Sequence, residues 1–227
     1  MINRLHSPKR SLRAFGLALV AVLAFAGLAA GSASALSVNP SSGSGNVKGA
    51  GFNWQASGGP AYTCESSSGN YSVSGGTGGL FEEVKLRGCA ANIGGFKVNC
   101  TTSGQLAGTI ALSNLSSSLV YLDAAKTKFG YKLTPVGGTV AQFSCGGSSY
   151  KWTGSVLGQI TEPPFNTWTK SAKLRFTATS GSQDYQQVEG AGTAYHLYQS
   201  QNGGSNVNLA IVTDLNLESS TAFSFQP

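Results

Sequence analysis

The chain has few charged residues and few of the side chains that favour helices. Only 11% of its 227 residues are charged, whereas 31 are glycine. After position 35, no stretch of ten or more residues repeats its apolar side chains with the 3.6-residue period of an amphipathic helix. Abundant glycine, serine and threonine instead favour short strands joined by tight turns. The composition therefore argues against a helical bundle and for an all-β fold.

Histidine and acidic residues are also scarce, which limits the possible catalytic mechanisms. His196 is the only histidine after position 35, and no Gly-x-Ser-x-Gly elbow accompanies it, so a Ser-His-Asp hydrolase has no support. A carboxylate-dependent glycan hydrolase remains an alternative, because two acids can cleave a glycosidic bond without histidine. Glu82 and Glu83 are adjacent and would point to opposite sides of a strand. The remaining pairs combine Glu189 with Asp184, Glu162 or Asp214. None has a supporting motif, so we assign no catalytic residue.

Motifs for metals, cofactors and nucleic acids are missing as well. The sequence contains no Cys-x-x-Cys pair and no calcium loop of the Asp-x-Asp-x-Asp-Gly type. The net charge of +6 falls to +2 after position 35, because four of the fifteen Lys and Arg residues precede that point. The remaining cations are scattered singly, whereas nucleic-acid binding needs a dense basic face. We therefore predict no metal, no cofactor and no nucleic-acid partner.

Residues 1–35 have the three parts of a secretory signal peptide. Four cations precede an uncharged apolar run over residues 14–30, and Ala33-Ser34-Ala35 forms a cleavage site of small residues. The cations are Arg4, Lys9, Arg10 and Arg13. A retained membrane anchor is the alternative, although the run is shorter than the roughly 20 residues of a typical span. We predict export, with no integral membrane span after cleavage, and a product that is secreted or associated with the cell envelope.

The clearest strand pattern lies in residues 84–112. Val84 and Leu86 alternate with two charged residues, and the same alternation recurs over residues 96–99. Gly94-Gly95 can form the reversal between these runs, because glycine accepts positive φ angles. About a dozen strand-like runs follow residue 46, at the spacing of a sandwich or barrel. We predict a flexible polar segment over residues 36–45 and a single antiparallel β domain over residues 46–227, either a β-sandwich or barrel-like.

The four cysteines predict two disulfides, because an oxidising compartment favours paired thiols. Three connectivities are possible. We favour Cys89–Cys100 together with Cys64–Cys145, since Cys89 and Cys100 flank the predicted reversal and the other two end strand-like runs. Free buried thiols and a zinc site are the alternatives, and the zinc site has the weaker support.

Several short motifs span most of the chain after position 35. They are Cys64, Gly88-Cys89, residues 100–104, residues 143–146, residues 154–161 and residues 181–183. This pattern resembles a group of uncharacterised secreted proteins from soil-dwelling high-GC Gram-positive bacteria. The resemblance implies export and an all-β, disulfide-containing fold, and it implies no known activity, cofactor or site.

Aromatic residues near a proline-containing loop are the candidate ligand-binding residues. Trp152 and Trp168 bracket the loop at residues 162–166, and Tyr150 lies close to Trp152 in the sequence. Exposed aromatic rings can stack on sugars, although burial in the core is the alternative for each ring. We predict a non-catalytic secreted β-domain that binds an extracellular glycan or cell-envelope component through Trp168, Trp152 and Tyr150.

Two other functions remain open from the sequence. A structural or surface-assembly protein would associate through exposed sheet edges. A membrane-embedded strand assembly is suggested by Phe223 and Phe225, but the four cysteines and the short strands oppose it. The sequence does not define the oligomeric state.

Overall fold

The computed structural model describes residues 36–59, 61–179 and 181–227, which form one compact unit of antiparallel strands. The predicted all-β fold is confirmed, whereas the predicted signal peptide lies outside the described residues. The part of the chain that the structure describes has no helix long and apolar enough to cross a membrane. Its strands are β1 (Ser37–Asn39), β2 (Gly43–Ala56), β3 (Ala61–Ser74), β4 (Gly78–Arg87), β5 (Ala90–Ile93), β6 (Phe96–Thr101), β7 (Ile110–Ala111), β8 (Leu115–Tyr121), β9 (Phe129–Pro135), β10 (Thr139–Cys145), β11 (Ser148–Gly154), β12 (Val156–Glu162), β13 (Thr169–Phe176), β14 (Ala178–Thr179), β15 (Ser182–Gln183), β16 (Leu197–Gln201) and β17 (Val207–Gln226).

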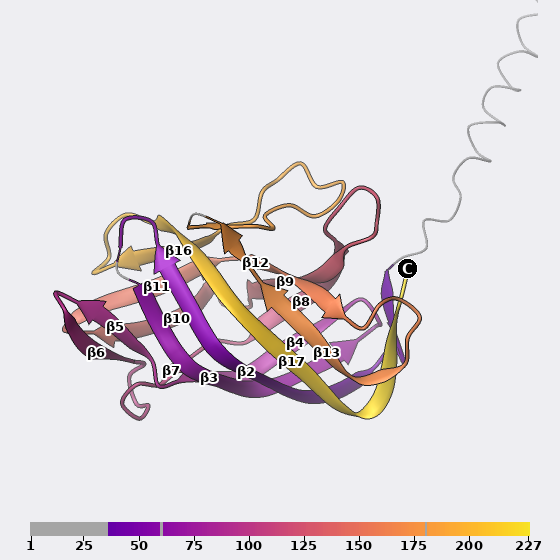
Figure 1. Ribbon diagram of the computed structural model, residues 1–227, viewed down its shortest axis with the longest axis horizontal. Coiled ribbons are helices and arrows are strands. Elements are labelled where there is room, and N and C mark those ends of the chain that lie inside the picture. Colours follow the sequence, from indigo (N-terminus) through magenta and orange to yellow (C-terminus); the bar gives the residue numbers. More distant parts are fainter. Residues whose placement is uncertain (1–35, 60, 180) are drawn as a thin grey trace, which may run out of the picture. The chain divides into compact units, whose positions relative to one another are not determined.

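The strand pairings close the main sheet into two rings that share β2, β3 and β17. The first ring continues from β17 through β16, β11, β10, β6 and β5 to β3. The second continues from β17 through β13, β12, β9, β8 and β4 to β3. The shared strands are long enough to serve both rings, with 14, 14 and 20 residues, and Figure 1 shows them as the long curved strands of the sheet. The architecture is therefore closed rather than an open sandwich.

Strands β11 and β12 show how the chain passes from one ring to the other. β11 pairs with β10 and β16 in the first ring, whereas β12 pairs with β9 and β13 in the second. Gly154, at the end of β11, has a φ angle of 94°, and a Cβ there would collide with the carbonyl oxygen of His196. Glycine is required at this position because other residues rarely adopt that backbone angle and their Cβ would not fit.

The N-terminal segment differs from the prediction. Residues 36–45 were expected to be flexible, but Ser37–Asn39 forms β1 against the end of β17, and β2 already begins at Gly43. Leu36 and Val38 are each only 6% exposed. These two apolar side chains, separated by one residue, fit the period of a strand. Because the residues that follow are mostly serine and glycine, the sequence pattern did not indicate this strand.

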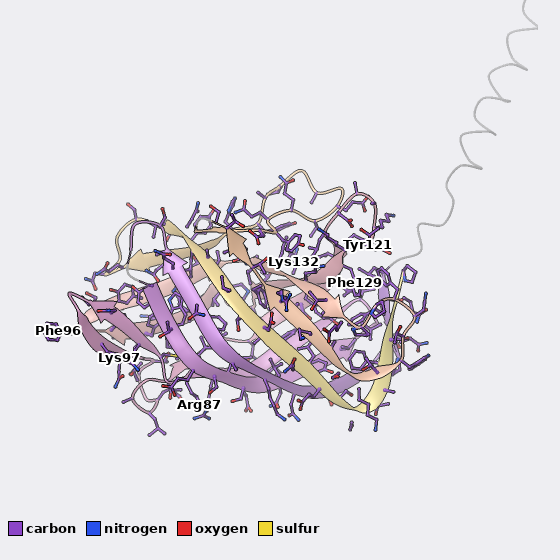
Figure 2. The ribbon with its side chains drawn as sticks, viewed as in Figure 1. Arg87, Phe96, Lys97, Tyr121, Phe129 and Lys132 are labelled. Atoms are coloured by element: carbon purple, nitrogen blue, oxygen red, sulfur yellow. A yellow bond between two sulfur atoms is a disulfide. The ribbon has the colours of Figure 1, made fainter. Side chains whose placement is uncertain are left out.

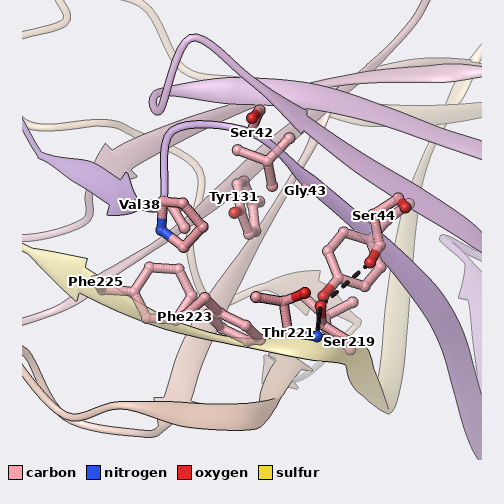
Figure 3. Close-up of a pocket in the computed structure, with 13 residues that line it drawn as sticks. Val38, Ser42, Gly43, Ser44, Tyr131, Ser219, Thr221, Phe223 and Phe225 are labelled. Carbon is pink, nitrogen blue, oxygen red and sulfur yellow. Dashed lines mark hydrogen bonds between the residues drawn. The ribbon is translucent and has the colours of Figure 1, made fainter.

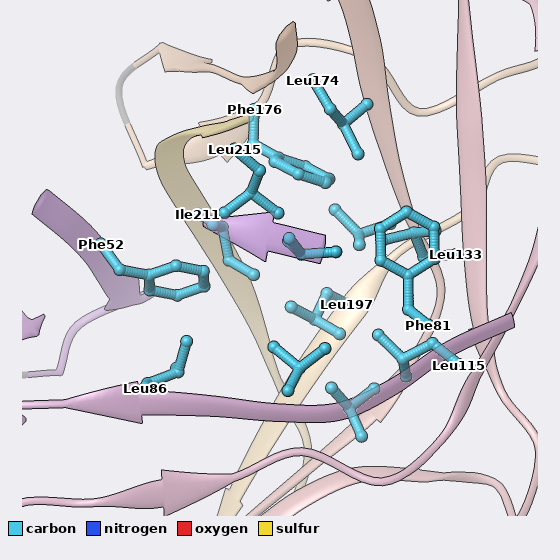
Figure 4. Packing of buried hydrophobic residues seen from close by; sticks show 14 of the residues in the cluster. Phe52, Phe81, Leu86, Leu115, Leu133, Leu174, Phe176, Leu197, Ile211 and Leu215 are labelled. Carbon is cyan, nitrogen blue, oxygen red and sulfur yellow. The ribbon is translucent and has the colours of Figure 1, made fainter. Parts of the chain in front are cut away.

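A single hydrophobic core fills the interior of both rings. It is built from every second residue along the strands, because successive side chains of a strand point to opposite faces of the sheet. Figure 4 shows part of it, where Phe52, Phe81 and Phe176 pack among leucines from several strands. The core therefore holds together strands that are far apart in the sequence.

The disulfide pairing that we favoured from the sequence is wrong. The bonds join Cys64 to Cys89 and Cys100 to Cys145, with Cα–Cα distances of 4.0 and 4.3 Å. The four residues lie in a row across neighbouring strands, since Thr63 pairs with Ala90 and Cys145 pairs with Cys100.

Backbone hydrogen bonding distinguishes the central pair of cysteines from the two bonded pairs. The amide of Cys100 donates to the carbonyl oxygen of Cys89 at 2.9 Å, so this pair faces across a hydrogen-bonded position. In an antiparallel ladder such positions hold their Cα atoms about 5.5 Å apart, whereas non-hydrogen-bonded positions are about 4.5 Å apart. The sulfur bridges form at the closer positions. The predicted hairpin itself is confirmed, with Gly94 and Gly95 at φ angles of 60° and 87°.

Candidate ligand-binding pocket

The structure separates the three aromatic residues that we predicted to bind a ligand. Trp152 is fully buried, and its indole Nε1 donates to Oε1 of Gln199 at 2.9 Å. Tyr150 is 3% exposed and stacks on Phe143, with ring centroids 5.6 Å apart. Both rings belong to an aromatic cluster inside the first ring of strands, together with Trp54. The prediction that Trp152 and Tyr150 bind a ligand at the surface is therefore wrong, because both point into the core.

Trp168 is the one predicted ligand-binding residue that lies at the surface, with 58% of its area exposed. It follows a loop that is fixed from both sides. Phe165 stacks on Phe129 with centroids 4.2 Å apart, and the amide of Asn166 donates to the carbonyl oxygen of Phe225 at 2.8 Å. Side chains held by such contacts lose little entropy on binding. The exposed indole thus projects from an anchored loop.

A pocket of about 70 Å³ lies in the second ring, near this loop. Thr169, next to Trp168, pairs with Phe223, and Phe223 lines the pocket. The pocket is at the end of the sheet where β1 pairs with the last residues of β17. We call it the end pocket, and Figure 3 shows it. Its lining residues are Val38, Pro40, Ser42, Gly43, Ser44, Tyr71, Val73, Tyr131, Leu217, Ser219, Thr221, Phe223 and Phe225.

The end pocket has a polar mouth and an apolar base. Ser42, Ser44 and Thr221 at the mouth are exposed, whereas the side chains of Leu217 and Phe225 at the base are almost fully buried. Ser219 orders one side of the mouth. Its hydroxyl donates to the carbonyl oxygen of Ser44 and accepts from the amide of Thr221, each at 3.2 Å (Figure 3). This change from a polar mouth to an apolar base suits an amphipathic ligand group that enters with its apolar part first.

Two tyrosines supply the polar atoms inside the end pocket. Burial raises the pKa of Tyr71 to about 12, and a hydrogen bond with Ser219 opposes that rise. Burial also raises the pKa of Tyr131, with a smaller contribution from Tyr71. Both phenols are therefore neutral at physiological pH. Tyr131 is 4% exposed, and among the described residues its hydroxyl takes part in no side-chain hydrogen bond, although it is not one of the fully buried polar atoms that lack a partner. Figure 3 places Tyr131 in the middle of the lining residues.

A second, smaller cavity lies among core residues from both rings, including Trp152 and Leu197 of the first and Phe81 and Leu133 of the second. Its volume is about 50 Å³, and its lining is apolar except for Ser67. The Ser67 hydroxyl is buried without a hydrogen-bond partner among the described residues. Phe81 lines this cavity and lies 6.1 Å from the ring of Tyr131, which lines the end pocket. Packed aromatic rings therefore stand between the two spaces.

Several acidic residues of the described chain pair with cations at the surface. Glu162 pairs with Lys173, and Glu218 pairs with Lys48 at 2.7 Å. Both Asp214 carboxylate oxygens accept hydrogen bonds from Arg175, and this lowers the pKa of Asp214. In the part of the chain that the structure describes, no acid lines the end pocket, and no three His, Cys, Asp or Glu side chains cluster as metal ligands. The hydrolase alternative gains no support from this arrangement.

Two larger hollows lie on the outer surface, but neither is enclosed. One, of about 320 Å³ over β2, β3 and β4, contains Lys85, Arg87 and Glu83. Charges of both signs meet there, and Asn70 already donates to Glu83 at 3.3 Å. The other, of about 310 Å³, lies beside β14 and β15 and includes Val212. Open surfaces of this kind bury little of a ligand, which makes the end pocket the better candidate.

No protein-family model, curated protein or solved structure matches the chain. Function is therefore inferred from the residues and their geometry alone. Sequence reasoning missed Tyr71 and Tyr131, although each sits at an inward position of an alternating strand. Their shared pocket has no local motif that could have revealed it.

Proposed function

We propose that this chain is a secreted, non-catalytic β-domain that binds an extracellular glycan or cell-envelope component through the end pocket and Trp168. The observation that carries the proposal is the exposed indole of Trp168, held on an anchored loop at the same end of the sheet as the end pocket. Indole rings stack on the apolar faces of sugars, and neighbouring hydroxyl groups supply hydrogen bonds. Two disulfides support a location in an oxidising compartment.

Retention on insoluble polysaccharides and on purified bacterial cell wall tests this function. The protein should be retained, and Trp168→Ala should reduce retention at least fivefold, because losing one stacking aromatic at a binding site costs roughly 1–3 kcal/mol. Phe96→Ala is the matched control. Phe96 is 76% exposed at the tip of the β5–β6 hairpin, away from the labelled Phe129 that packs beside the end pocket (Figure 2). Equal loss in both variants, or no retention of the unmodified protein, would contradict the proposal.

A further inference from the structure

The size, polarity and charge of the end pocket together narrow the chemical class of the ligand. We infer that the end pocket receives the acetyl group of an acetylated sugar, with the Tyr131 hydroxyl donating a hydrogen bond to the acetyl carbonyl oxygen. This inference rests on the proposed glycan-binding function and names the group that the pocket selects. The acetyl methyl would contact the apolar base, while the sugar ring would remain at the polar mouth.

The volume of the pocket matches a small group rather than a whole sugar. A cavity of about 150 Å³ accommodates the six carbon atoms of benzene. By this scale the 70 Å³ of the end pocket holds roughly three non-hydrogen atoms. An acetyl group has three. A pyranose ring is too large to enter and would lie across the mouth.

The lining of the pocket provides one contact for each part of an acetyl group. Leu217, Phe223 and Phe225 offer an apolar surface to the methyl. Tyr131 lines the pocket with a hydroxyl that makes no side-chain hydrogen bond to another described residue. A ligand that covered this hydroxyl without pairing it would remove its hydration at a cost in free energy. A plain alkyl group would leave this hydroxyl unpaired, whereas a carbonyl oxygen accepts from it. Ser42 and Ser44 at the mouth can then bond to the amide or to the ring hydroxyls.

The absence of charge in the lining argues against an ionic ligand group. Among the described residues, no Lys, Arg, His, Asp or Glu lines the end pocket. Both tyrosines are held neutral by burial, which raises their pKa values. A carboxylate, phosphate or ammonium group would lose its hydration without gaining a counter-ion, and this cost is large. The pocket thus discriminates an acetylated amino sugar from the free amine.

Binding to matched polysaccharides tests the inference directly. Chitin and cellulose share a β-1,4-linked backbone, but only chitin carries an N-acetyl group on each sugar. Acetylated xylan and the same xylan after alkaline deacetylation form a second pair, in which the acetyl group is an ester. The protein should bind the acetylated member of at least one pair at least fivefold more tightly than the unacetylated member. The pair that shows this preference tells whether the pocket receives the acetyl group of an amide or of an ester.

Tyr131→Phe is the decisive variant, because it removes only the donor. It should weaken binding to the acetylated polymer by about fivefold, the value of one neutral hydrogen bond, and weaken binding to the unacetylated polymer less. Tyr198→Phe is the matched control, since Tyr198 lies on β16 outside the pocket. Loss of the acetyl preference in Tyr131→Phe but not in Tyr198→Phe supports the inference.

Other outcomes separate the inference from the function on which it rests. Equal binding to both members of each pair, with both lost in Trp168→Ala, overturns the acetyl assignment and leaves glycan binding intact. An acetyl preference that survives in Tyr131→Phe also overturns the assigned contact. If chitin, cellulose, both xylans and cell wall all fail to retain the protein, the acetyl assignment and the proposed function fall together.

Discussion

Trp152 and Trp168 are sixteen positions apart, yet they occupy opposite environments. Trp152 is enclosed by the first ring of strands and hydrogen-bonds to Gln199, while Trp168 projects from a loop into solvent. The local sequence around each residue is mixed and polar, so it does not distinguish them. Which environment a ring occupies depends on the closure of the strands around it, and here Trp152 points into the first ring, where it packs against Trp54 and Phe143.

The two residues should differ sharply in their contribution to stability. Trp152→Ala should lower the free energy of unfolding by about 3–5 kcal/mol, because it opens a cavity and leaves the Gln199 side chain unpaired. Trp168→Ala should change it by no more than about 0.5 kcal/mol. Chemical denaturation of both variants measures the difference. Similar losses in the two would show that Trp168 is not as exposed as the structure has it.

Tyr71 predicts how stability responds to alkaline pH. Its pKa of about 12 in the folded protein lies above the value of about 10 in an unfolded chain. The unfolded chain therefore releases this proton first as the pH rises. The associated stability is fully present below about pH 10 and is lost between about pH 10 and 12.

Unfolding free energies measured from pH 8 to 12 check this expectation. They should fall above pH 10, and the fall should be smaller in Tyr71→Phe, which has no phenolic proton to lose. Tyr131, whose pKa is also raised by burial, contributes in the same direction, so the decline should persist in part. An unchanged slope in Tyr71→Phe would contradict the assigned burial of its hydroxyl.

At the scale of elements, local reversals were predictable but strand partners were not. The β5–β6 hairpin follows from alternation and from Gly94-Gly95, which lie within a few residues of one another. The pairing of β5 with β3 and of β6 with β10 joins segments that are distant in the sequence. The disulfides follow those long-range pairs rather than the hairpin, and this is where sequence reasoning failed.

Peptide mapping without reduction tests the disulfide connectivity. Digestion should yield linked peptides that contain Cys64 with Cys89 and Cys100 with Cys145, and each link should vanish on reduction. On the chain-entropy model, removing either bond should cost about 3–4 kcal/mol, because each closes a loop of 25 or 45 residues. A peptide that links Cys89 to Cys100 would refute the assigned row of bridges.

At the scale of the whole molecule, closure of the rings determines how many unpaired strand edges are open to pairing with another copy of the chain. Pairing of β16 with β17 and of β3 with β4 uses backbone groups that an open sheet would expose. The strand order ends at β7, which has only two residues and is followed by a single bridge from Leu112 to Ala141. Closed sheets offer little template for edge-to-edge association.

We therefore expect the described unit to be monomeric in solution. Size-exclusion chromatography with light scattering should give the mass of one chain over a wide range of concentrations. The surface-assembly alternative instead requires association that increases with concentration. Discrete oligomers or fibres that persist in Phe96→Ala, which removes the most exposed of the described phenylalanines, would favour that alternative.

The sequence by itself determined the all-β class, the position of the glycine reversal and the presence of enough cysteines for two bridges. These properties depend on side-chain alternation, backbone preference and composition, which act within a few residues of one another. Only the tertiary structure decided the ring closure, the disulfide partners, the burial of Trp152 and Tyr150, and the end pocket. The pocket draws its lining from β1, β2, β3, β9 and β17, and its shape arises only when long-range burial brings these strands together.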